Sequence, residues 1–145
     1  MIRRALAFYF LTIVIGSFIR GAGILFDPHL EWESFAIAGG LFFASLFIAT
    51  LFSFPTVIIA ILFYAILHFV KPGAHLYYII SGAFGVILIS AWMFLLGWFF
   101  RQPATDFAPY WWTYGIASVI AGLLVSYLHL KGYLQSPWKD PRKVY

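Results

Sequence analysis

The chain of 145 residues contains no cysteine and few charged side chains. Without cysteine it can form no disulfide, no thiolate metal site and no thiol nucleophile, which excludes thiol redox carriers. Charged residues make up 10% of the sequence, whereas a soluble domain usually has about 25%. Hydrophobic residues make up 63%, so little polar surface is left to face water. We therefore predict an integral membrane protein that forms a single domain over residues 1–145.

The long apolar runs lack Asp, Glu, Lys and Arg throughout residues 35–70, 77–100 and 107–130. An ionisable group inside a bilayer is costly and usually marks a route for protons, ions or substrates. Its absence argues against a coupled transporter. The sequence also has no glycine-rich phosphate loop, no HExxH motif and no carboxylate placed for a Ser-His-Asp triad. We predict no enzyme, no catalytic residue and no metal site, and interpret the run FDPHLEWE around His29 as a solvated loop.

The apolar runs have the lengths of membrane-spanning helices. The hydrocarbon core is about 30 Å thick and a helix rises about 1.5 Å per residue, so a span needs about 20 residues. The sequence predicts an all-α membrane protein, a bundle of four transmembrane helices at about 5–26, 35–70, 77–100 and 109–130. Residues 131–145 then form a cytoplasmic tail.

The run 35–70 allows two interpretations, because it is too long for one span and short for two. A hairpin turning at residues 53–56 gives five crossings and places the chain ends on opposite faces. One long helix kinked at Pro55 gives four crossings, and seven of the nine basic residues then share a face. These are Arg3, Arg4, Lys71, Lys131, Lys139, Arg142 and Lys143. Lysine and arginine are retained in the cytoplasm during insertion, so we predict the kinked helix and cytoplasmic N- and C-termini.

Small residues four positions apart predict where the helices pack. Lipid gives no hydrophobic drive for helix association, so residues that let two backbones approach become the contact points. Gly39, Gly40 and Ala44 lie near the start of the second span. The predicted helix-packing positions in the third and fourth spans are Ser81, Gly85, Ala117, Ser118, Ala121 and Gly122.

Three histidines share one depth in the four-span arrangement. His68 ends the second span, His75 begins the third and His129 ends the fourth. Imidazoles from separate helices can bind a haem iron or a quinone, but histidine is also common at the membrane interface, where its ring faces lipid and its polar atoms face water. We predict no cofactor; a haem or quinone would use these residues, with His68 and His129 as the pair and Tyr77 and Tyr78 nearby.

Three stretches resemble parts of known membrane proteins. FPTVIIAIL, HLYYIISG and GIASVIAGLLVSYLHLKG look like corresponding stretches of small four-span bacterial inner-membrane proteins without assigned function. The resemblance rests on apolar residues and small-residue spacing. It implies four helices and a bacterial inner membrane, and it implies no activity.

These features together predict a non-enzymatic accessory or assembly subunit of a larger membrane complex. Its expected partners are the lipid bilayer and either another membrane protein or a second copy of the chain, with no nucleic acid. One alternative is a small channel or permease-like homo-oligomer, lined by Thr50, Ser53, Thr56 and Ser90. The other is a membrane anchor that binds haem or quinone.

Overall fold

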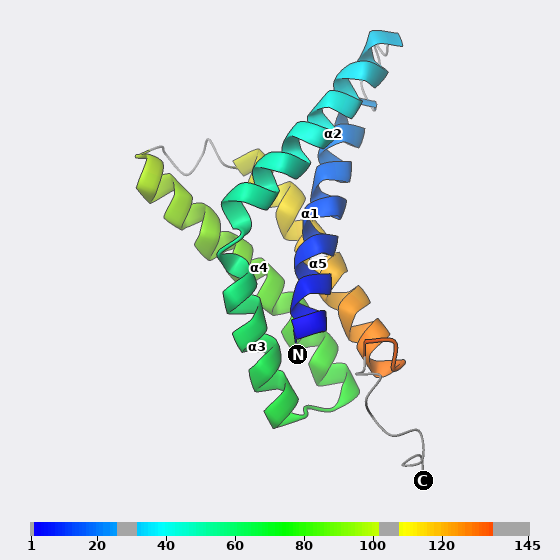
Figure 1. The fold of residues 1–145 in the computed structure, drawn as a ribbon, viewed down its shortest axis with the longest axis vertical. Helices are drawn as coiled ribbons and strands as arrows, with labels where there is room; N and C mark the ends of the chain where they lie inside the picture. The colour runs from blue at the N-terminus through cyan, green and yellow to red at the C-terminus, as the bar shows by residue number, and fades with distance from the viewer. Residues whose placement is uncertain (1, 26–31, 102–107, 135–145) are drawn as a thin grey trace.

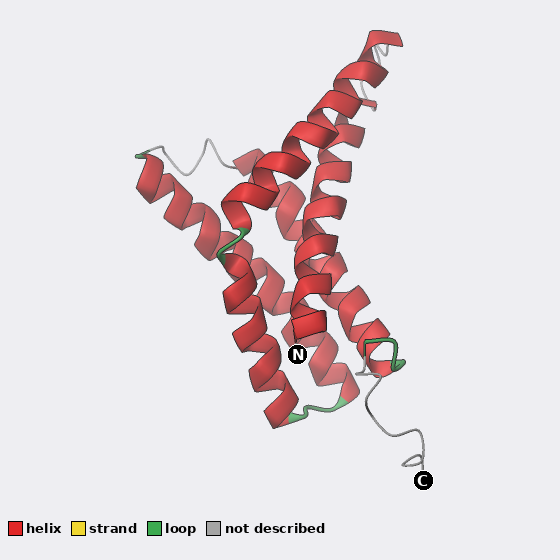
Figure 2. Cartoon of the chain, in the orientation of Figure 1, coloured by secondary structure: helices red, strands yellow, loops and turns green. Residues whose placement is uncertain are grey.

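The structure, a computed structural model, describes residues 2–25, 32–101 and 108–134. Within these residues it contains five α-helices and no strand (Figures 1 and 2). The helices are α1 (Ile2–Leu25), α2 (Trp32–Ser53), α3 (Thr56–Val70), α4 (Ala74–Phe100) and α5 (Ala108–Leu130). The prediction of an all-α chain is confirmed.

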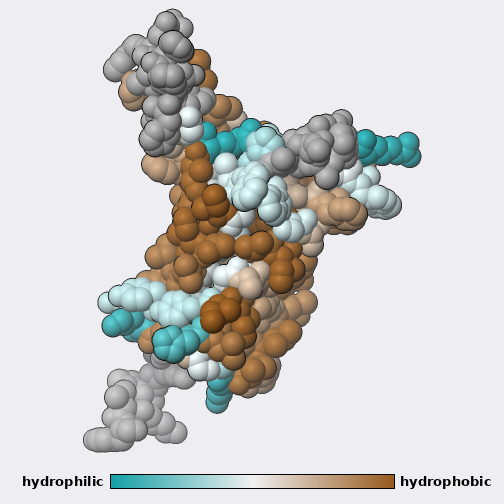
Figure 3. All heavy atoms as spheres, turned by 180° about the vertical axis from the view of Figure 1, so that it is seen from behind, coloured by the Kyte–Doolittle hydropathy of each residue, from teal (hydrophilic) through white to brown (hydrophobic). Residues whose placement is uncertain are grey.

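Four of the helices in the described residues are long and apolar enough to cross a membrane. The qualifying segments are Ile2–Gly23, Phe35–Ser53, Ala74–Phe100 and Pro109–Leu130. Hydrophobic residues form a broad band across the middle of the molecule, and hydrophilic ones gather towards its ends (Figure 3). This distribution is typical of a multi-pass membrane protein.

The segment predicted as one kinked helix is two helices, and that prediction is wrong in this respect. Pro55 has no N–H to bond the carbonyl of Leu51, and its ring clashes with that carbonyl. The break is therefore complete: α2 ends at Ser53 and α3 begins at Thr56. Nearby hydroxyls bond the backbone, because Ser53 donates to the carbonyl of Ala49 and Thr56 donates to that of Ser53 at 2.6 Å.

The chain nevertheless continues through the break instead of turning back. Figure 1 shows α3 carrying on from the end of α2 towards the part of the molecule where α1 begins. The Tyr9 hydroxyl in α1 donates to the carbonyl of Thr50 in α2 at 2.9 Å, and Arg4 in α1 reaches His68 near the end of α3. Both helices therefore run antiparallel to α1, as four crossings require.

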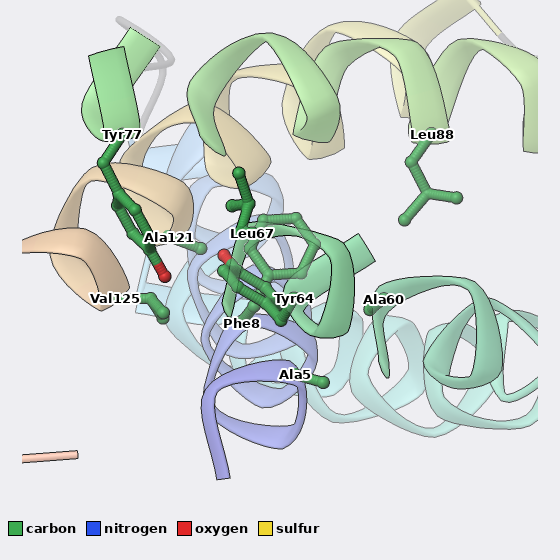
Figure 4. Packing of buried hydrophobic residues seen from close by; sticks show 9 residues of the cluster. All are labelled: Ala5, Phe8, Ala60, Tyr64, Leu67, Tyr77, Leu88, Ala121 and Val125. Carbon is green, nitrogen blue, oxygen red and sulfur yellow. The ribbon is translucent and has the colours of Figure 1, made fainter. Parts of the chain in front are cut away.

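The bundle has two ends that are named here for use below. At the Arg4 end, α1 and α4 begin and α3 and α5 finish; at the Arg20 end, α1 and α4 finish and α2 and α5 begin (Figure 1). α1 lies at the centre and packs against α2, α3 and α5, while α4 packs mainly against α5. Phe8, Tyr64 and Val125 belong to the main buried cluster (Figure 4). Towards the Arg20 end, α2 and α4 diverge.

Candidate functional site

A buried arginine joins four helices at the Arg4 end. The side chain of Arg4 is 3% exposed. Its Nη1 donates to the Tyr77 hydroxyl at 2.9 Å and lies 3.3 Å from His129 Nε2, and its Nη2 lies 3.4 Å from His68 Nδ1. The partners come from α4, α5 and α3. We call these four residues the Arg4 cluster.

The chemistry of a guanidinium sets the direction of these contacts. Arginine only donates hydrogen bonds, so His129 Nε2 and His68 Nδ1 accept when they bond to it. Among the described residues, the hydrogen-bond partners of Arg4 are therefore one phenol and two imidazoles, and none of them is an acid.

Two further buried hydroxyls lie next to the Arg4 cluster. Tyr64 has Tyr77, Ser81 and Arg4 as its polar neighbours, and the hydroxyls of Tyr64 and Tyr77 face the same region (Figure 4). Tyr64 and Ser81 are fully buried, and their hydroxyls are neighbours. The polar groups thus extend from the Arg4 end into the apolar core, but none of them forms a nucleophile and base pair.

The structure brings together two of the three histidines considered above. His68 and His129 contact the same guanidinium, whereas His75 is exposed at the start of α4. The guanidinium lies within 3.4 Å of His129 Nε2 and His68 Nδ1, so these two ring nitrogens are not open to an iron while they contact Arg4. A quinone-binding role for them stays a prediction, and His29 lies outside the described residues.

Four of the predicted small residues, Ser81, Gly85, Ser118 and Gly122, lie at a close contact between α4 and α5. A Cβ on Gly122 would come within 2.7 Å of the Ser81 carbonyl oxygen, and one on Gly85 within 2.9 Å of Ser118. Ala117, Ala121, Ser81 and Ser118 are fully buried. Glycine is required at these two positions because any side chain would push the helices apart.

The hydroxyls considered for a channel lining bond to their own helices. Besides Ser53 and Thr56, Thr50 donates to the Leu46 carbonyl at 2.7 Å and Ser90 donates to that of Val86 at 2.8 Å. Ser90 also accepts from Trp111 Nε1 at 2.8 Å. The proton of each of these hydroxyls is therefore engaged within the chain, and the channel interpretation stays a prediction.

The described residues contain no group of three or more His, Cys, Asp or Glu that could hold a metal ion. Comparison with protein families, with characterised proteins and with solved structures finds no match to this chain. Function is therefore inferred from the packing and chemistry of the chain's own residues.

Proposed function

We propose that this protein is a non-enzymatic accessory or assembly subunit of a larger membrane complex, and that α2 is its docking helix. The observation that carries this proposal is the uneven packing of the bundle. In the most apolar part of each span, 44% of α1 and 39% of α5 is buried, against 17% of α4 and 11% of α2, the lowest of the four. α2 is therefore attached along one side and presents the rest of its surface outwards.

The exposed surface of α2 includes small residues at the spacing of a helix contact. Ala36, Gly40 and Ala44 follow one another at intervals of four and are exposed. A Cβ on Gly40 would meet nothing within 4 Å in this chain. Glycine weakens a helix by about 1 kcal/mol relative to alanine, and no packing within the chain offsets that cost. A close approach by the helix of another subunit supplies a reason for it.

The large residues beside these positions suit lipid instead. Phe43 and Phe47 are 68% and 65% exposed, and bulky side chains keep two backbones apart. The first turns of α2 and the last turns of α1 extend beyond the point where α4 finishes (Figure 1). Phe35 and Ile37 are exposed near the start of α2, which favours a partner that covers them.

Gly40→Leu is expected to reduce recovery of the partner at least about fivefold, because a clash in a close helix contact costs about 1–3 kcal/mol. The measurement is co-purification of the tagged chain from native membranes in mild detergent, with quantitative mass spectrometry of the bound proteins. Phe43→Leu, on the adjacent lipid-facing surface, is the matched control and should retain the partner. A wild-type chain that purifies alone, or equal recovery with both variants, would refute the docking role. Two differently tagged copies distinguish a second copy of the chain from another protein.

We also propose that the chain lies in a bacterial inner membrane with both ends in the cytoplasm. The Arg4 end carries Arg3, Lys71 and Lys131 in addition to Arg4, and basic residues remain on the cytoplasmic side. The resemblance noted in the sequence supports the bacterial setting.

Reporter fusions after Gly132 and in front of Ile2 are expected to give cytoplasmic signals, active as a fluorescent protein and inactive as alkaline phosphatase. A fusion within residues 102–107 should give the opposite pattern. Signals that place Ile2 and Gly132 on opposite sides would be incompatible with four crossings.

A further inference from the structure

A cleft opens between α2 and α4 in the half of the bundle nearest the Arg20 end. It has a volume of about 290 Å³, and its floor is formed by α5. Its walls are almost entirely apolar. The lining residues include Leu41, Ala44, Ile48, Phe52, Met93 and Leu96. Two of the lining side chains meet across the cleft, because Phe52 of α2 contacts Phe100 of α4 with ring centroids 5.9 Å apart.

The dimensions of the cleft fit a single hydrocarbon chain. On α2 it extends from Leu41 to Ser53, which is about 18 Å of helix and somewhat more than half of a hydrocarbon core about 30 Å thick. A groove of this length suits a thin, extended apolar molecule that reaches from the membrane surface past the middle of the bilayer.

A cation lies at the surface end of the cleft. Arg20 lines it, and the guanidinium carbon is held 3.7 Å from the centroid of the Tyr110 ring. Of the other polar groups of the wall, Tyr114 bonds to Ser17 at 3.2 Å and donates to the Ser45 carbonyl at 3.4 Å, and the buried Trp92 Nε1 has no hydrogen-bond partner among the described residues. A positive charge at the surface end and apolar walls below it match an anionic headgroup with an acyl chain attached.

From this charge and shape we propose that the cleft binds an anionic phospholipid from the leaflet at the Arg20 end. One acyl chain lies between α2 and α4, and the headgroup phosphate bonds to Arg20. The docking positions and the cleft share Ala44, but Gly40 does not line the cleft, so variants at Gly40 test partner docking separately from lipid binding.

The test is native mass spectrometry of the full chain supplied with equal amounts of phosphatidylglycerol and phosphatidylcholine. The wild type is expected to retain phosphatidylglycerol about fivefold more often, as one arginine near an anionic headgroup produces. Arg20→Gln should bring the ratio of the two lipids close to one, and Arg20→Lys should preserve the preference.

A second variant tests the cleft itself without changing the charge. Ile48→Trp puts a large ring into the cleft and should remove most of the retained lipid of either kind. Phe47→Trp is its matched control, because Phe47 is exposed beside the cleft and does not line it; it should retain lipid as the wild type does. An undiminished preference in Arg20→Gln, full retention in Ile48→Trp, or no lipid on the wild type would each overturn the proposal.

Discussion

Arg4→Met is expected to destabilise the bundle by about 3 kcal/mol, since hydrogen bonds to a charged donor contribute about 1.5–3 kcal/mol each and the partners would be left partly unsatisfied. Arg4 is the donor shared by Tyr77, His68 and His129. Without it, α3, α4 and α5 lose their common polar contact with α1. The measurement is reversible unfolding in mixed micelles with increasing dodecyl sulfate.

Lys131→Met is the control for the loss of one positive charge at the same end. Lys131 is exposed, and its ammonium lies 5.9 Å from the Tyr127 ring, so its removal should change stability little. Arg4→Lys should fall between the two, because an ammonium keeps the charge but lacks the fork that reaches several acceptors. Equal stability of Arg4→Met and the wild type would show that the Arg4 cluster does not hold the helices together.

Gly122→Ala is expected to cost about 2 kcal/mol, in the range found when a packed site is overfilled. The new methyl group would lie 2.7 Å from the carbonyl oxygen of Ser81 and 3.0 Å from its carbonyl carbon. Backbone cannot move aside as a flexible side chain can, so α4 and α5 must separate. The same unfolding measurement reports the loss.

Gly115→Ala is the matched control in the same helix. A Cβ at Gly115 would meet nothing within 4 Å, and alanine is the better helix former, so this variant should be as stable as the wild type or slightly more stable. If both variants behaved alike, the close approach of α4 and α5 would not limit stability.

The sequence was sufficient to predict the positions of the helices, but it was not sufficient to predict the break between α2 and α3. The predicted spans 5–26, 77–100 and 109–130 agree with α1, α4 and α5 to within three residues at each end. Apolar runs of that length specify helices because no other structure satisfies the backbone in lipid. At Pro55 the same rule leaves two outcomes open, a kink or a complete interruption, and the structure shows the interruption.

The Arg4 cluster could be predicted only in part. The shared depth of His68 and His129 followed from counting residues along each span, and the structure places both in contact with Arg4. The sequence indicates only that Arg4 helps to set the orientation of the chain in the membrane, because a basic residue beside an apolar run usually has that role. Its burial depends on how α1 is rotated about its axis, and the hydrophobic pattern does not determine that rotation when nearly every side chain is apolar.

The contacts of Arg4 also bear on the order in which the helices come together. Its partners follow it by 64, 73 and 125 residues, so Arg4 is synthesised long before His129. Until α5 has been made, the guanidinium lacks one of its three partners. The full set of contacts around Arg4 therefore forms only after α5 has joined the other helices.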